Sequence, residues 1–312
     1  MVRRGARGVA AAHLGVETEP LGIGSMTNLQ HQRLVNLGCG RQWHPAWINF
    51  DTWAPDPRVR KHDLTKGIPL PDNSVDVVYH AHILEHFDRT GGLRFLRECF
   101  RVLNEGGIIR VVVPDLERIA RLYLRALEQS INGSMEWQES YDWLMLEMYD
   151  QATRDYPGGG ITDYFRGRTD PVPPFVVERM GRVPIERLME ALAATSGPQP
   201  SRPTFKKIFK RLSSVRTRAA RAIVHGLLGE DDYRALSVGV FRQSGEVHRW
   251  MYDRYSLARS LNDTGFLDPH LCTATSSSIP GWRSYSLDAD SEGAAHKPDS
   301  LYMEAVKDNT RK

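Results

Sequence analysis

Short apolar runs alternate with amphipathic segments along much of this chain. The apolar runs have the length and composition of buried strands, and they cover residues 33–38, 46–51, 74–79 and 108–115. The amphipathic segments carry apolar residues at helical spacing, and they cover residues 91–107, 116–127 and 253–266. Strands and helices that alternate across short turns predict an α/β fold with a mostly parallel sheet.

The regular alternation stops in the middle of the chain. Residues 129–245 hold aromatic clusters, a glycine run and Pro-rich breaks, which we interpret as a largely helical insertion because so many aromatic side chains are atypical of disorder. Order returns with the helix at 253–266 and an antiparallel last strand at 300–307 (SLYMEAVK). We therefore expect a flexible arm (1–28), a sheet domain (29–128 and 246–307) and an insertion (129–245) that covers the substrate side.

Composition restricts the class of protein. The 312 residues are 41% apolar and carry a net charge of +3, which is too balanced overall to indicate nucleic acid as a partner. Three separated cysteines are typical of a reduced chain without a disulfide framework, and no apolar run is long enough to span a membrane. We expect a cytoplasmic protein, and the sequence gives no indication of its oligomeric state.

The run Leu34–Asp51 contains Gly38-Cys39-Gly40 at the end of the first apolar strand, and Asp51 ends the second. Glycines at the end of a strand let the backbone turn and let a ligand approach closely. An acidic side chain at the end of the neighbouring strand can accept hydrogen bonds from ribose hydroxyls. Trp43 occupies the third-glycine position of the dinucleotide fingerprint. The pattern therefore favours a nucleoside without a diphosphate.

The stretch from Leu34 to Pro114 resembles the class I S-adenosylmethionine-dependent methyltransferases, in the branch called methyltransferase type 11. The similar segments, in order, are LVNLGCG, INFD, DLTKGIPLPDNSVDVVYHAHILEH and FLRECFRVLNEGGIIRVVVPD. The resemblance implies a Rossmann-like methyltransferase sheet and S-adenosyl-L-methionine as cofactor. The C-terminal segments also resemble members found among bacterial polysaccharide-biosynthesis enzymes.

Carried over by position, the resemblance implies a set of cofactor-binding residues. Gly38, Cys39 and Gly40 would border the amino-acid part of the cofactor, and Asp51 would bind the ribose. Asp63 would face the adenine amino group and Leu64 would pack on the ring, while His80 would lie beside the methionine portion. Asn36 stands where the family has an acid. The interval from Gly40 to Asp51 is short and contains Pro45, so we expect a loop or a single turn there in place of a full helix.

His80, His82 and His86 raise the question of a metal site. Glu85 is misplaced for the H-E-x-x-H arrangement, and we interpret these histidines as core, rim and cofactor-side residues. We expect no metal ion.

The stretch GEVHRWMYDRYS (245–256) concentrates polar and aromatic side chains directly before a helix. One interpretation is a polar pocket, in which Trp250, Tyr252 and Arg254 bind substrate. His248 is then our first choice for the general base and His86 the second. The other interpretation is a structural corner in which Asp253 caps the helix.

The expected reaction is methyl transfer to an oxygen of a glycan or another small hydroxylated acceptor. Two alternatives stay open. One is N-methylation of a small metabolite or natural product, and the other is a methyltransferase-fold scaffold with weak catalysis.

Residues 202–221 form a basic segment with eight Lys or Arg and no acid. Its apolar residues fall at helical spacing, which is typical of a helix that lies on an anionic membrane surface or meets an anionic substrate, but a helix docked on its own domain has the same pattern. Contact with the membrane, with the substrate or only with its own domain all stay open for this segment.

Overall fold

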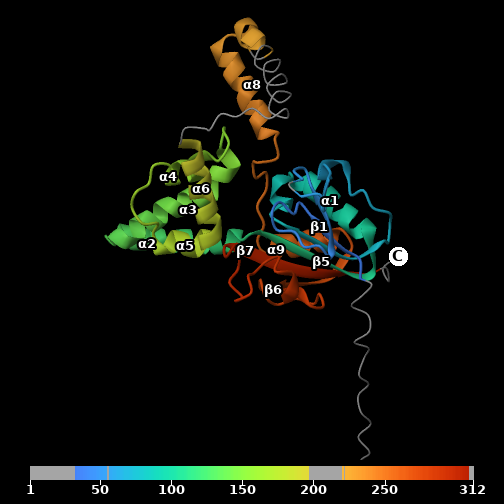
Figure 1. Ribbon diagram of the computed structural model, residues 1–312. Coiled ribbons are helices and arrows are strands. Elements are labelled where there is room, and N and C mark those ends of the chain that lie inside the picture. The colour runs from blue at the N-terminus through green and yellow to red at the C-terminus, as the bar shows by residue number, and fades with distance from the viewer. Residues whose placement is uncertain (1–31, 55, 197–219, 221, 309–312) are drawn as a thin grey trace, which may run out of the picture. The chain divides into compact units, whose positions relative to one another are not determined.

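The computed structural model describes residues 32–54, 56–196, 220 and 222–308 (Figure 1). The chain divides into two compact units, residues 1–32 and residues 33–312, and almost all described residues belong to the second. The predicted arm (1–28) lies outside the described residues. So does the predicted basic segment (202–221), except for Ala220.

The described strands form one seven-stranded sheet with the order β3-β2-β1-β4-β5-β7-β6. β7 runs antiparallel to both of its neighbours, while the pairs among β1 to β5 are parallel. The predicted α/β fold, mostly parallel with an antiparallel last strand, is therefore confirmed. The strands are β1 (Leu34–Leu37), β2 (Trp47–Asp51), β3 (Val59–Lys61), β4 (Val75–Ala81), β5 (Leu103–Pro114), β6 (Phe266–Cys272) and β7 (Ser300–Lys307).

Two helices, α1 (Arg89–Val102) and α9 (Arg254–Asp263), pack on one face of the sheet (Figure 1). Both begin at an aspartate whose carboxylate accepts first-turn backbone N–H groups, Asp88 in α1 and Asp253 in a full capping box in α9. The buried residues of α1 recur at helical spacing, so the face predicted to be apolar is the face that packs on the core. The predicted cap of Asp253 is confirmed.

The other face of the sheet is covered differently. The β1–β2 connection contains no helix, as expected from its length and from Pro45. Parallel neighbours usually need a longer crossover, and its helix would cover this face. Here the segment between β6 and β7 covers it and contributes Ile279, Trp282 and Leu287 to a second core cluster.

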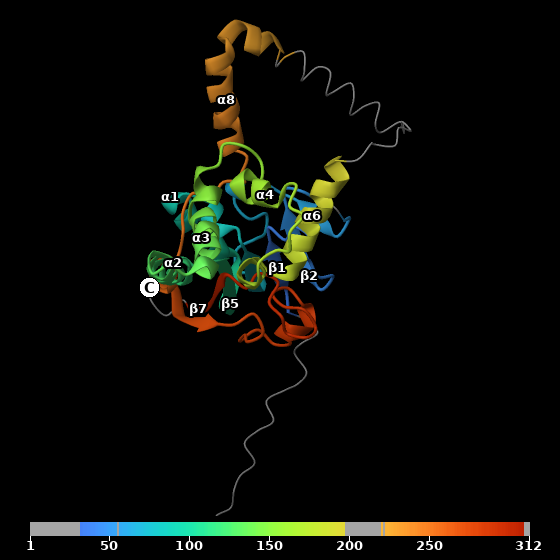
Figure 2. The ribbon, with the colours of Figure 1, turned by 90° about the vertical axis from the view of Figure 1, so that its left-hand side faces the viewer.

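The described part of the insertion is largely helical, as predicted. Its described helices are α2 (Leu116–Ile131), α3 (Met135–Thr153), α4 (Gly159–Phe165), α5 (Pro174–Met180), α6 (Arg182–Ser196) and α8 (Glu230–Arg242). Helices α3 to α6 share a small core around Trp143 and Phe165, and Figure 2 shows α3, α4 and α6 gathered together. A buried ion pair between Glu147 and Arg179 joins α3 to α5. The predicted boundary at 128/129 falls inside α2, which packs against α3.

None of the described helices has the length and apolar character needed to cross a bilayer.

Candidate functional site

The turn after β1 is fixed by its glycines. Gly38 and Gly40 have φ of 66° and 52°, in the left-handed region where a side chain is strained. Gly38 and Cys39 donate their backbone N–H groups to the Phe50 carbonyl at 2.8 and 3.1 Å. Gly40 donates its N–H to Asp51 Oδ2 at 2.8 Å. The turn after β1 is thus held against the end of β2.

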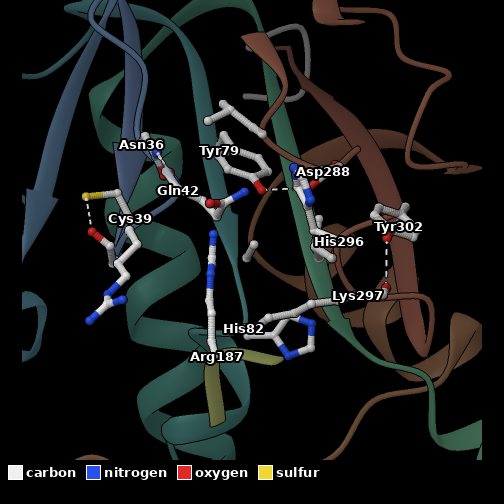
Figure 3. A pocket seen from close by; sticks show the side chains of 16 residues that line it. Asn36, Cys39, Gln42, Tyr79, His82, Arg187, Asp288, His296, Lys297 and Tyr302 are labelled. Carbon is white, nitrogen blue, oxygen red and sulfur yellow. Dashed lines mark hydrogen bonds between the residues drawn. The ribbon is translucent and has the colours of Figure 1, made fainter. Parts of the chain in front are cut away.

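A cavity of about 340 Å³ opens beside this turn, at the carboxyl ends of β1, β4 and β5 (Figure 3). This edge is where ligands bind in open α/β sheets. The glycine turn, the ends of β4 and β5, helix α6, the loop before β7 and β7 itself contribute side chains. The cavity is lined by Asn36, Gly38, Cys39, Gly40, Arg41, Gln42, Tyr79, Ala81, His82, Val112, Arg187, Leu287, Asp288, His296, Lys297 and Tyr302.

The far wall of the cavity is anchored to the centre of the sheet. Arg110, fully buried in β5, donates from Nε to Asp288 Oδ2 at 2.8 Å and from Nη1 to Glu304 Oε1 at 2.6 Å. The Tyr79 hydroxyl donates to the other oxygen of Asp288 at 2.6 Å. Burial and the Asp288 charge raise the pKa of Tyr79 well above its usual value, so this hydroxyl stays protonated.

Cationic groups dominate the lining. Arg41 and Arg187 carry positive charge, and Lys297 adds an amino group whose pKa is lowered by burial. The imidazoles of His82 and His296 add two polar rings. Asp288 is the one carboxylate among the lining residues, and its oxygens already accept from Arg110 and Tyr79. The cavity therefore favours an anionic group.

Four predicted cofactor residues, Asn36, Gly38, Cys39 and Gly40, line this cavity together. The Asn36 amide donates to the Gln42 carbonyl at 2.9 Å and to Asn49 Oδ1 at 3.3 Å. Burial, with Asp51 nearby, raises the pKa of Cys39 to about 12, so its thiol stays neutral. Cys39 is therefore a small buried residue of the turn, and its neutral thiol is a poor nucleophile.

Asp51, Asp63 and Leu64 do not line the cavity. Besides accepting from Gly40, Asp51 accepts from the Trp53 N–H at 2.7 Å. Asp63 caps the short 3-10 helix η1 (Leu64–Lys66), and its hydrogen bonds from Thr65 lower its pKa. Leu64 packs partly on the sheet core. Their contacts with ribose and adenine stay predictions.

His80 faces away from the cavity, which corrects its predicted position. Successive residues of a strand point to opposite faces, so Tyr79 and Ala81 line the cavity while His80 points toward α1. Its ring lies edge-on to Phe95, with centroids 5.1 Å apart, and neither ring nitrogen has a hydrogen-bond partner among the described residues. Burial lowers the pKa of His80 to about 4, so the ring is neutral.

His82 follows β4 in a strained conformation, with φ of 55°. Its Nε2 lies 2.8 Å from Ser300 Oγ, and its Nδ1 lies 3.2 Å from Glu85 Oε1. Glu85 belongs to the 3-10 helix η2 (Leu84–His86) and is fully buried. Burial alone would raise the pKa of this carboxyl, but His82 and the neighbouring histidines lower it to about 2.

His248 and His86, the two predicted bases, lie together but outside the residues that line the cavity. Their rings stand edge to face, with centroids 4.8 Å apart. Burial lowers the pKa of His248 to about 3, and burial also lowers that of His86. Because neither ring reaches the cavity, the geometry does not support the predicted role of either as the base.

The predicted substrate residues Trp250, Tyr252 and Arg254 also lie outside the cavity lining. Tyr252 is buried in the sheet core, and Arg254 pairs with Glu117 at 3.0 Å. The Trp250 ring is half-exposed, with the Arg89 guanidinium 5.9 Å from its centroid. The residues 245–256 therefore form a structural corner before α9, the second of the two sequence interpretations.

Several lining residues were missed by the sequence reasoning. Arg187 lies in an insertion without a recognisable motif. Asp288, His296 and Lys297 lie in a segment for which the sequence pattern predicts neither strand nor helix. An available signal was the HKPD stretch (296–299) directly before β7, which places polar groups at the sheet edge.

Residues 35–111 match a family model described as a methyltransferase domain. A curated relative from Mycolicibacterium smegmatis is 44% identical over 61 residues, which are 19% of this chain and 23% of that protein. Another, from Mycobacterium tuberculosis, is 47% identical over 62 residues, 20% of this chain and 21% of that protein. Both descriptions begin "Probable S-adenosylmethionine-dependent methyltransferase". The matches thus span about a fifth of the length of these relatives.

Two solved structures are similar at low identity. An S-adenosylmethionine-dependent methyltransferase from Mesorhizobium loti is 15% identical, with 88% of this chain and 90% of that chain covered and a TM-score of 0.35. One from Archaeoglobus fulgidus is 12% identical, with 88% and 86% covered and a TM-score of 0.33. Similarity at this level carries no argument about function. The sequence matches support the resemblance to class I methyltransferases over residues 35–111 and imply S-adenosylmethionine as the cofactor.

Proposed function

We propose that this chain is an S-adenosylmethionine-dependent methyltransferase that methylates an oxygen of a hydroxylated acceptor bearing a negative charge, such as an acidic glycan. The observation that carries this proposal is the cationic cavity at the carboxyl ends of β1 and β4, which the glycine turn borders directly. A glycine turn at this edge is suited to the cofactor, and the cations opposite are suited to an acidic acceptor.

The residues at the turn fit the amino-acid end of the cofactor. The side-chain oxygen of Asn36 accepts no hydrogen bond from the described residues, so it is free for an ammonium group. No atom lies within 4 Å of the position that a Cβ of Gly40 would take, which leaves space for close approach. The Asp51 oxygens accept hydrogen bonds from the backbone N–H groups of Gly40 and Trp53. They keep further lone pairs that can accept hydrogen bonds from ribose hydroxyls.

S-adenosylmethionine supplies a methyl group that its sulfonium already activates. The protein therefore mainly orients the acceptor oxygen and removes its proton. We assign the base role to His296 in place of His248 and His86. Its Nε2 lies 3.1 Å from the Ser286 carbonyl, which can only accept, so the neutral ring carries its hydrogen there. Nδ1 is then the nitrogen that takes a proton.

The acceptor's charge is inferred from Arg187 and Lys297. Both line the cavity from elements outside the matched region 35–111, in α6 and in the segment before β7. Guanidinium and ammonium groups recognise carboxylates and phosphates. An acidic sugar presents such a group beside its hydroxyls.

The test combines cofactor binding with methyl transfer. Titration calorimetry should show that S-adenosylhomocysteine binds the full chain, and labelled S-adenosylmethionine should methylate hexuronate-containing oligosaccharides faster than their neutral counterparts. His296→Ala should lower kcat strongly and leave S-adenosylhomocysteine affinity unchanged, because a base acts only on the acceptor step. Absence of S-adenosylhomocysteine binding would refute the assignment as a whole.

The two alternatives give different results in the same assay. An N-methyltransferase would label amines and leave hydroxylated acceptors unlabelled. A scaffold with weak catalysis would bind cofactor poorly and label neither class. Equal rates of methylation on acidic and neutral sugars would contradict the proposal that the acceptor is negatively charged. They would leave the methyltransferase assignment unchanged.

The location at a membrane face remains a prediction from sequence charge. The wild type should sediment with anionic vesicles at low salt. A variant with Gln at Lys206, Lys207, Lys210 and Arg211 should stay in the supernatant. If the wild type does not sediment with these vesicles, the basic segment has no membrane role.

A further inference from the structure

A carboxylate and two imidazoles from distant parts of the chain meet behind the cavity. Glu85 and His86 lie on η2, which follows β4, and His248 lies in the stretch before α9. One ligand-type atom from each residue lies within 4.8 Å of the others. The Glu85 carbonyl accepts from the N–H groups of Arg249 and Trp250 at 2.7 and 3.2 Å, so the backbone holds the two segments together.

The Glu85 carboxylate is buried without a well-formed hydrogen bond. The residue is fully buried, and among the described residues neither carboxylate oxygen has a partner of hydrogen-bond geometry. His82 Nδ1 approaches Oε1 to 3.2 Å, a distance typical of an ion pair, but the contact does not have the geometry of a hydrogen bond. A buried carboxylate without donors costs several kcal/mol unless it is paired or coordinates a metal.

The His86 ring presents a free lone pair toward the same space. Its Nδ1 is buried, and none of the described residues offers it a hydrogen-bond partner. In the neutral ring with the hydrogen on Nε2, Nδ1 has a lone pair that can bind a metal ion. Histidines that bind metals usually donate the N–H of their second nitrogen to a carbonyl, a carboxylate or water.

We propose that Glu85, His86 and His248 bind a divalent transition-metal ion, such as Zn²⁺ or Co²⁺. Two imidazoles and one carboxylate suit these ions better than Mg²⁺, which prefers oxygen ligands. Three protein ligands leave further positions to water. The ion would give the buried Glu85 carboxylate a cationic partner. It would also link η2 to the stretch before α9. The site is independent of methyl transfer, so its test does not rest on the proposed function.

A second group, His270, Cys272 and Glu304, also brings ligand-type atoms together. It is a weaker candidate because Glu304 already accepts from Arg110, Ser277 and the Ser278 N–H. His270 is also half-exposed. This group supplies the matched control for the experiment.

The experiment uses the full chain, dialysed against a chelator and titrated calorimetrically with ZnCl₂ and separately with MgCl₂. We expect one Zn²⁺ per chain, no comparable Mg²⁺ binding, and a rise in Tm with Zn²⁺ because the ion binds the folded state. Glu85→Gln and His248→Ala should weaken Zn²⁺ binding at least 100-fold, while His270→Ala should leave it unchanged. Co²⁺ should give visible absorption bands that the same two variants lose.

Circular dichroism of each variant separates loss of the site from loss of the fold. If Glu85→Gln does not fold, the wild-type stoichiometry and His248→Ala still decide. A wild type that binds no Zn²⁺ overturns the proposal. So does a folded His248→Ala that keeps full affinity, or a loss of binding in His270→Ala alone, which would place the ion in the other group.

Discussion

Arg110 Nε donates to Asp288 Oδ2 at 2.8 Å, and this bond joins the centre of β5 to the segment that forms one wall of the cavity. The same guanidinium lies 4.3 Å from the Trp282 ring centroid, inside the second core cluster. A crossover helix normally covers this face of the sheet. Here the segment between β6 and β7 covers it, and the buried Arg110 anchors that segment to β5.

Replacement of Arg110 by Ala should therefore destabilise the protein strongly. The change leaves Asp288 and Glu304 buried without their cation, which costs about 3–5 kcal/mol. Denaturant unfolding measures the loss. Arg121→Ala is the control, since its exposed pair with Glu117 should contribute about 1 kcal/mol or less. Similar small losses in both variants would contradict the anchoring role of Arg110.

Gly40 and Gly106 form a matched pair for testing the cofactor turn. Both have positive φ, and neither has an atom within 4 Å of where a Cβ would lie, but only Gly40 lines the cavity. Alanine should cost each about 1–2 kcal/mol of backbone strain. S-adenosylhomocysteine affinity, measured by calorimetry, should fall at least tenfold in Gly40→Ala and stay unchanged in Gly106→Ala. Equal affinities would place the cofactor elsewhere.

The sheet and the glycine turn could be predicted from the sequence because their signals are local. The Leu34–Leu37 strand, the helix that Asp253 caps and the short β1–β2 connection each depend on residues close in the chain. A strand's face also follows from its period, yet the family pattern places His80 beside the cofactor, whereas the structure turns its ring toward Phe95. The alternation of Tyr79, His80 and Ala81 could have corrected this placement.

The acceptor side could not be predicted, for a physical reason. Arg187 and His296 reach one cavity through tertiary packing, with no periodicity or motif that brings them together. The sequence allows two interpretations of the polar stretch around His248, a polar pocket and a structural corner, because buried polar residues can mark a site. Here its polar groups instead join η2, α3 and α9, as the His248 N–H does by donating to the Gln151 carbonyl at 2.9 Å.

His80 makes the protein sensitive to acid. Burial lowers its folded-state pKa to about 4, below the ordinary value of 6.5, so the unfolded chain binds more protons between these pH values. Stability from this group is present above pH 6.5 and is lost as the pH falls toward 4, by about 3 kcal/mol in total.

His80→Leu should remove this loss. It also deletes two unpartnered ring nitrogens at similar side-chain volume, so stability at pH 7 should rise by about 1 kcal/mol or more. Urea unfolding at pH 7 and pH 5 measures both effects, and S-adenosylhomocysteine affinity should not change. An unchanged pH profile, or a weakened affinity, would return His80 to the cofactor side.

Arg187 should act on the acceptor and not on the cofactor, because it reaches the cavity from α6 while the glycine turn lies after β1. Arg187→Gln removes one partly solvated cation, worth about 1 kcal/mol, so KM for an acidic acceptor should rise about fivefold. Steady-state kinetics at low salt should show this rise with S-adenosylhomocysteine affinity unchanged, and added salt should narrow the difference from wild type because it screens the charge. Arg182→Gln makes the same substitution on the same helix at an exposed position outside the cavity lining, and its KM should match the wild type. A KM increase of equal size in both variants would mean that the overall charge of α6 attracts the acceptor, without a contact from Arg187.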